Sequence, residues 1–232
     1  MASIKFISKT LLFVFLLLNM QRMNAQAHLN YSETEQRMAS MGLVDIKQLD
    51  PSILVQLVYA TADNFVGEVL YDDINKAFLR PEAAEAVVRA QQLLKKENPG
   101  YTLLVYDAAR PMAVQKNMKD KVRGTSMDIY VSSPENGGGL HNYGMAVDIT
   151  IADDSGAPLS MGTDFDFLGK ESNIDKEQEL VAKGKITESE RLNRELLRKV
   201  MKGAGFMPLK TEWWHFNFCT RAYAKANLSL IE

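Results

Sequence analysis

The sequence predicts an α+β fold, a single domain with a central, mainly antiparallel sheet flanked by helices. Helix-like and strand-like segments follow one another without a regular strand–helix–strand alternation. No glycine-rich dinucleotide or phosphate fingerprint and no internal repeat occurs among them. A length of 232 residues, of which 46% are hydrophobic and 24% charged, fits one globular core.

The N-terminal segment has the features of a secretory signal peptide. Two lysines precede an apolar run at 11–18, which is too short to cross a bilayer comfortably, and small residues end the polar stretch that follows. We therefore expect residues 1–27 to be removed by cleavage after Ala25 or Ala27. Residues 28–232 would then form one exported domain, periplasmic or secreted, without stable insertion in a membrane.

The charge and the cysteine content narrow the class of protein further. Residues 1–27 carry three basic and no acidic side chains, so their removal changes the formal net charge from -2 to -5. A mildly acidic domain argues against nucleic acid or anionic lipid as the main partner. Cys219 is the single cysteine, so an intramolecular disulfide is impossible, and its apolar neighbours predict a small core residue.

The first half of the chain predicts a helical lead-in, two strands and one long helix. Residues 28–50 are polar and mixed, which favours a helix, and the β-branched segment 53–59 predicts a strand followed by a turn-rich loop. From Pro81 the apolar positions recur at helical spacing, and this helix should end at 98–100, the sequence Asn-Pro-Gly. Segment 101–107 then predicts the next strand.

The second half predicts two further strands, one short helix and one long helix. The short helix is expected at 113–119, and the alternating segment 146–151 predicts a strand with one face toward the core. Residues 162–186 are charged and irregular, which indicates a surface excursion. A capping-box pattern at 187–190 begins an amphipathic helix, and the aromatic segment 211–218 predicts the last strand.

Two of the three histidines stand beside carboxylates. His141 is followed seven residues later by Asp148, and His215 is preceded three residues earlier by Glu212, whereas His28 lies near the expected new N-terminus. Two imidazoles and one carboxylate are a normal ligand set for a catalytic zinc ion, with a fourth position left for water. The sequence therefore predicts one zinc per chain, held at one edge of the sheet.

The remaining carboxylate would serve as the base. A single anionic ligand lets zinc lower the pKa of bound water toward ~7, and a nearby carboxylate can accept its proton. We assign His141, Asp148 and His215 to the metal and Glu212 to the proton. Spacing alone leaves open the reverse assignment, with Glu212 as ligand and Asp148 as base. In a regular strand Glu212 and His215 point to opposite faces, so both reach one site only through a bend or bulge.

Five ordered blocks carry a resemblance to a known family. They are YATADNF at 59–65, YDAARP at 106–111, HNYGMAVDIT at 141–150, MGTDFD at 161–166 and EWWHF at 212–216. With these blocks the chain resembles the D-alanyl-D-alanine dipeptidases of the vancomycin-resistance type, zinc peptidases related to DD-carboxypeptidases. The resemblance implies zinc on His141, Asp148 and His215, Glu212 as proton acceptor and donor, and Arg110 as the group that stabilises the transition state.

Other residues of these blocks have two interpretations. Tyr59, Asp63 and Asn64 resemble the family's substrate-side loop, although a purely structural turn explains them equally well. For Arg110 the alternative is a salt bridge with Asp107. The tryptophans at 213 and 214 are expected to pack and to form pocket walls.

One position departs from the family pattern. Family members usually carry a serine two residues before the first zinc histidine, and here that position is Gly139. The loss of a hydroxyl near the substrate puts strict dipeptide specificity in doubt, while the metal ligands and the base remain.

The resemblance implies that residues 28–232 hydrolyse the small dipeptide D-alanyl-D-alanine to two D-alanines, in peptidoglycan precursor turnover or in glycopeptide resistance. Two alternatives stay open. A DD-carboxypeptidase or endopeptidase acting on peptidoglycan peptides would need an open groove. A non-catalytic, zinc-stabilised binding domain would lack the base or fill the fourth coordination position.

Overall fold

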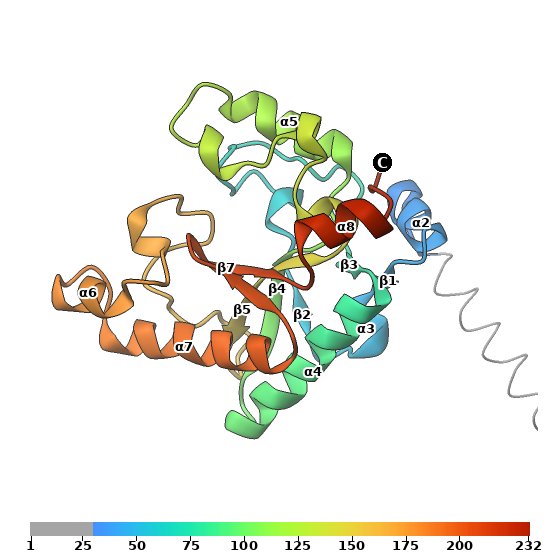
Figure 1. The fold of residues 1–232 in the computed structure, drawn as a ribbon. Helices are drawn as coiled ribbons and strands as arrows, with labels where there is room; N and C mark the ends of the chain where they lie inside the picture. The colour runs from blue at the N-terminus through green and yellow to red at the C-terminus, as the bar shows by residue number, and fades with distance from the viewer. Residues whose placement is uncertain (1–29) are drawn as a thin grey trace, which may run out of the picture.

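The computed structural model describes residues 30–232, so the predicted signal peptide and His28 lie outside the described residues. Within this part of the chain every helix is too short or too polar to span a membrane. The described residues form a mixed α+β domain whose sheets are flanked by helices (Figure 1).

The central sheet has five strands in the order β2-β4-β5-β7-β6. Only the β2–β4 pair is parallel, and the other three neighbouring pairs are antiparallel, as the sequence predicts. A second, two-stranded sheet pairs β1 with β3. The strands are β1 (Val44–Asp45), β2 (Leu54–Val55), β3 (Phe78–Leu79), β4 (Thr102–Asp107), β5 (Ala146–Ala152), β6 (Met207–Leu209) and β7 (Glu212–Asn217).

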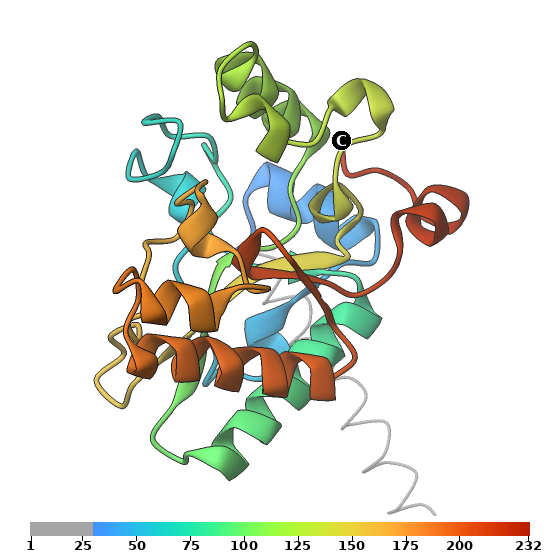
Figure 2. The same ribbon diagram turned by 60° about the vertical axis from the view of Figure 1, so that its left-hand side comes forward.

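Helices cover the sheet from opposite sides. In both views α4 and α7 lie together below the sheet while α5 lies above it (Figures 1 and 2). The α-helices are α2 (Glu33–Ser40), α3 (Ile46–Leu49), α4 (Pro81–Glu97), α5 (Met112–Val122), α6 (Glu177–Ala182), α7 (Glu188–Gly203) and α8 (Arg221–Asn227). Short 3-10 helices are η1 (Val58–Ala60), η2 (Asp128–Tyr130), η3 (Pro134–Asn136), η4 (Leu140–Tyr143) and η5 (Lys170–Ser172).

The helix α4 begins and ends where the sequence predicts, and α7 begins at the predicted capping box. Pro81 occupies the first turn of α4, and the helix ends before Asn98. At α7, Glu190 N–H donates to Thr187 Oγ1 (3.2 Å) while Thr187 N–H donates to Glu190 Oε2 (2.6 Å), which completes the capping box. Local chemistry therefore determines these boundaries.

The structure confirms the N-terminal helix and shortens the strand expected after it. The helix expected within 28–50 is α2, which β1 and α3 follow. The strand expected at 53–59 is only Leu54–Val55: after Gln56 N–H pairs with the Val105 carbonyl (2.9 Å), the chain leaves the sheet and forms η1. Tyr59 is therefore held in a turn, where its ring is buried.

The strand β5 and the segment after it are more buried than their sequence patterns alone indicate. All seven residues of β5 are buried, because both faces of this middle strand are covered. Residues 162–186 contain η5 and α6, and they include buried Ser172 and Glu177 as well as exposed side chains. This segment is therefore more than a surface excursion, since part of it packs back over the sheet.

Candidate active site

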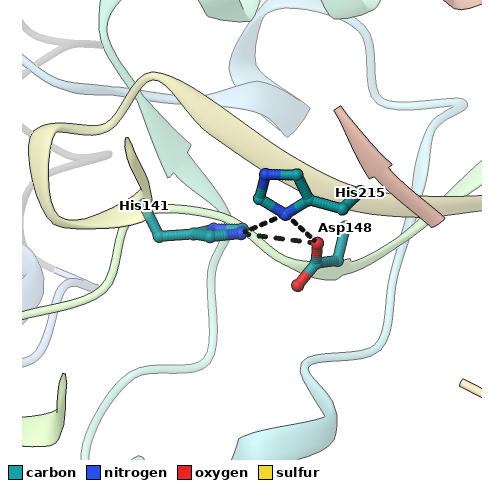
Figure 3. A group of neighbouring side chains, drawn as sticks. All are labelled: His141, Asp148 and His215. Atoms are coloured by element: carbon teal, nitrogen blue, oxygen red, sulfur yellow. Dashed lines mark hydrogen bonds and ion pairs between the residues drawn. The ribbon is translucent and has the colours of Figure 1, made fainter. Parts of the chain in front are cut away.

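The sheet and η4 bring the three predicted metal ligands together (Figure 3). Asp148 lies on the middle strand β5, and His215 lies directly opposite it on β7. His141 belongs to η4, which precedes β5. The two strand residues thus come from inner strands of the sheet.

The distances among these side chains suit a tetrahedral metal. His141 Nε2 lies 3.2 Å from His215 Nδ1 and 3.4 Å from Asp148 Oδ1, and His215 Nδ1 lies 2.9 Å from the same oxygen. Tetrahedral zinc with bonds of about 2.0–2.1 Å separates its ligand atoms by about 3.3 Å. The donor set and its spacing therefore fit a zinc-sized ion.

Hydrogen bonds orient both rings toward one another. His141 Nδ1 lies 2.7 Å from the Ala108 carbonyl oxygen, and His215 Nε2 lies 2.9 Å from Asn217 Oδ1. Because these oxygens only accept, each neutral ring donates there and keeps its lone pair on the nitrogen that faces the cluster. Such facing lone pairs repel unless a cation or a proton lies between them.

The pKa shifts of His215 and Asp148 also favour a cation or a proton within the cluster. Burial lowers the pKa of His215, but the hydrogen bond and charge of Asp148 outweigh it and raise this pKa to about 9. Burial likewise opposes ionisation of Asp148, yet His141 and His215 lower the pKa of Asp148 below its ordinary value. The cluster therefore keeps one negative charge and favours a positive charge beside it.

Glu212 reaches the same cavity through the irregularity that the sequence analysis required. It is the first residue of β7, and the register of the β6–β7 pair shifts between Pro208 and Leu209. Its Oε2 lies 4.0 Å from His215 Nδ1. Burial raises the pKa of Glu212, with Asp148 adding to the effect and His215 opposing it. Asp148, which is nearer both imidazoles, is better placed than Glu212 to bind a metal.

Arg110 follows β4 and is held from three directions. Asp107 Oδ2 accepts from its Nε (3.2 Å) and Nη2 (2.5 Å), and Gln115 Oε1 accepts from its Nη1 (2.9 Å). The guanidinium also lies 5.1 Å from the centre of the Tyr59 ring. Burial opposes the charge, but Asp107 raises the pKa of Arg110 well above its ordinary value. The salt bridge with Asp107 is therefore present, and the same guanidinium also lines the cavity.

These groups line one cavity of about 390 Å³. Its walls include Tyr59, Arg110, Gln115, Ser132, Gly139, His141, Asp148, Asp166, Glu212, Trp214 and His215. A possible metal site, a carboxylate with a raised pKa and a guanidinium thus open on the same small volume. That is the arrangement of a hydrolytic site.

The comparisons with known proteins agree with this chemistry. The sequence profile of the peptidase M15 family, described as D-Ala-D-Ala dipeptidase, matches residues 39–231. The chain belongs to the D-Ala-D-Ala dipeptidase family. It is therefore related to peptidases over almost all of its described length.

Three relatives show how far the similarity extends. The D-alanyl-D-alanine dipeptidase of Escherichia coli (strain K12) is 29% identical over 174 residues, covering 75% of this chain and 83% of that protein. The dipeptidase of Enterococcus faecium is 30% identical over 178 residues (68% and 82%), and that of Synechocystis is 29% identical over 215 residues (78% and 81%). A solved LD-carboxypeptidase, LdcB, aligns with a TM-score of 0.39 and 21% identity over 64% of this chain and 63% of its own.

The dipeptidase substrate loop expected from the sequence is only partly brought to the cavity. Tyr59 lines it, whereas Asp63 is exposed and neither Asp63 nor Asn64 belongs to the cavity wall. The Asn64 amide donates to the carbonyls of Thr61 (2.7 Å) and Glu68 (2.8 Å), so it closes its own loop. The tryptophans behave as expected: Trp214 is buried and forms a wall, and Trp213 Nε1 donates to Thr163 Oγ1 (2.8 Å).

Asp166 is a cavity residue to which the sequence analysis gave no role. Among the described residues it is the one non-glycine residue with a positive φ, 61°, a conformation that costs about 1–3 kcal/mol. Tyr59 donates to its Oδ1 (3.2 Å), while its buried Oδ2 has no hydrogen-bond partner in the described part of the chain. Burial, and then the charge of Asp148, raise its pKa well above the ordinary value. The sequence feature that could have pointed to Asp166 is its position as the last residue of the MGTDFD block.

The structure also shows what surrounds Gly139, where this chain departs from the family pattern. A Cβ atom added at Gly139 would lie 3.1 Å from Ser132 Oγ. Ser132 lines the same cavity. A hydroxyl from another segment therefore occupies the space beside Gly139.

Cys219, which the sequence predicts as a core residue, packs against the hydrophobic core but is only partly buried.

Proposed function

We propose that this peptidase hydrolyses D-alanyl-D-alanine and that it uses one zinc ion bound by His141, Asp148 and His215. The observation that supports it most is the convergence of three ligand atoms, all within 4.8 Å of one another, in a cavity that also contains Glu212 and Arg110. When bound, zinc would polarise the scissile carbonyl and lower the pKa of a water molecule.

Glu212 acts as the proton carrier in this proposal. Burial moves the pKa of this carboxyl group toward neutral pH. A base with such a pKa can accept a proton from water and then donate that proton to the leaving amine. Arg110 stays charged and faces the developing oxyanion, a role whose loss typically costs on the order of 10²–10³-fold in rate.

Asp166 gives the cavity a carboxyl group suited to the ammonium of a free dipeptide, because a bound cation opposes the effect of burial on its pKa and favours the carboxylate. Its Oδ2 is buried without a partner, and a buried carboxyl group in that state is costly unless a ligand completes its hydrogen bonds. Tyr59 holds the other oxygen. We propose that the substrate ammonium binds Asp166, which takes the substrate-binding role that the resemblance suggested for Asp63 and Asn64.

The cavity size supports a small substrate. Its volume of about 390 Å³ is near the lower end of small-molecule pockets, which span about 300–1,000 Å³. We therefore place a dipeptide ahead of intact peptidoglycan or a nucleic acid as the partner. The proposal includes export of residues 28–232, which depends on the N-terminal segment of the sequence alone.

The test is hydrolysis of D-alanyl-D-alanine by purified protein, measured as free D-alanine. We expect zinc-dependent turnover that a chelator abolishes and added zinc restores, no turnover by Glu212→Gln, and full turnover by the exposed control Glu195→Gln. Release of D-alanine from a pentapeptide ending in D-Ala-D-Ala, at a rate equal to or above that for the dipeptide, would favour a carboxypeptidase instead. Zinc binding without any hydrolysis would favour a binding domain.

A further inference from the structure

Gln115 joins two walls of the cavity. It lies in the first turn of α5 and is 1% exposed. Its Oε1 accepts from Arg110 Nη1 (2.9 Å), and its Nε2 donates to the Ser132 carbonyl (2.8 Å). Each end of the buried amide therefore makes one hydrogen bond, one with Arg110 and one with the backbone of Ser132, and both residues line the cavity.

The Gln115 amide limits which N–H groups of Arg110 remain free to bind another group. A guanidinium has five N–H donors in one plane. Asp107 takes one from Nε and one from Nη2, and Gln115 takes one from Nη1. Two N–H groups are left, one on each terminal nitrogen. With the Tyr59 ring 5.1 Å away, the plane of the guanidinium is restricted as well.

The neutrality of Gln115 matters as much as its position. Asp107 already supplies one negative charge to balance Arg110. A second carboxylate at position 115 would leave a net negative group and weaken the attraction for a developing oxyanion. An amide accepts the Nη1 hydrogen bond without adding that charge, so the guanidinium stays oriented and effective.

We propose that Gln115 is a positioning residue: it holds Arg110 so that the free N–H groups of the guanidinium face the reacting carbonyl. This inference rests on the proposed function, because it assumes that Arg110 stabilises a developing oxyanion. It assigns Gln115 an effect on the transition state and little effect on binding of the ground-state substrate.

The first experiment compares two methionine variants. Gln115→Met keeps the side-chain length and removes the hydrogen bonds; we expect kcat to fall about 10- to 100-fold with KM changed less than about threefold. Gln91→Met is the matched control, because Gln91 is 2% exposed and its amide also makes two buried hydrogen bonds, to Thr102 Oγ1 (2.7 Å) and from Leu103 N–H (2.8 Å). It is not a cavity residue, so its kcat should stay within about twofold of the wild type.

A double-variant cycle separates positioning from support of the fold. If Gln115 acts through Arg110, adding Gln115→Met to Arg110→Ala should change kcat less than about twofold. The same loss in both backgrounds would overturn the inference. So would a Gln115→Met enzyme with wild-type kcat. Absence of hydrolysis by the wild type would instead contradict the proposed function.

A second variant covers failure of the methionine variant to fold. Gln115→Glu keeps the volume and the acceptor toward Arg110, and thermal unfolding reports whether it folds. We expect a kcat loss of at least about tenfold at neutral pH because of the added charge. A folded Gln115→Glu enzyme with unchanged kcat would contradict the role assigned to the neutral amide of Gln115.

Discussion

His215 Nδ1 lies 2.9 Å from Asp148 Oδ1, and the two residues are direct cross-strand partners on β7 and β5. The sheet register therefore sets this distance, and η4 only has to add His141. The two proposed ligands on neighbouring inner strands form a rigid base for a metal site, since neither strand can shift without breaking the ladder.

Replacement of Asp148 should remove the metal. Asp148→Asn loses the anionic ligand and leaves two neutral imidazoles, so we expect less than one zinc per chain after gel filtration and a fall in activity of at least about 100-fold. Atomic emission of purified protein measures the zinc. Asp154→Asn, an exposed change two residues beyond the end of β5, should retain full zinc and activity.

Metal-free protein should lose stability as the pH rises. The pKa of His215 is raised from 6.5 to about 9 by Asp148 against the effect of burial, so the protonated ring stabilises the fold fully below pH 6.5. That contribution is lost as the pH passes 9. We expect the Tm of chelator-treated protein to fall between pH 6.5 and 9, and zinc to remove most of this dependence. An equal fall with His215→Gln would show that another group is responsible.

Substrate binding should depend on Asp166. If its Oδ2 binds the substrate ammonium, Asp166→Asn should raise KM about 10- to 100-fold and change kcat less. Asp164→Asn, on the exposed part of the same loop, is the control. A dipeptide analogue without the amino group should bind the wild type and Asp166→Asn equally. If the variant raises KM for the analogue by the same factor, the effect lies in the loop and not in ammonium binding.

The space beside Gly139 gives a paired test. In Gly139→Ala the new Cβ would lie 3.1 Å from Ser132 Oγ, tighter than nine in ten real contacts, so the Ser132 side chain must shift by a few tenths of an ångström. We expect a lower Tm and a several-fold lower kcat/KM. Gly139→Ala with Ser132→Ala removes the contact and should recover the Tm. If it also recovers kcat/KM, the Ser132 hydroxyl does not bind substrate.

Much of the local structure followed from the sequence. The boundaries of α4 and α7 came from a proline, a capping box and helical periodicity, all of which act within a few residues. The extents of β1 and β2 did not follow from the sequence, because the length of a strand depends on which partner strand is available. That partner, β4 or β3, lies far away in the chain.

The sequence by itself determined the family, through five ordered blocks, and it indicated the candidate cluster His141, Asp148, Glu212 and His215 because interior histidines are few and each stands near a carboxylate. The tertiary structure alone decided which carboxylate lies nearest the imidazoles, by pairing β5 with β7 and shifting the β6–β7 register. It also brought Asp166 and Gln115 to the cavity. Their roles depend on burial and on hydrogen bonds between distant segments, and neither quantity is visible in the order of residues along a chain.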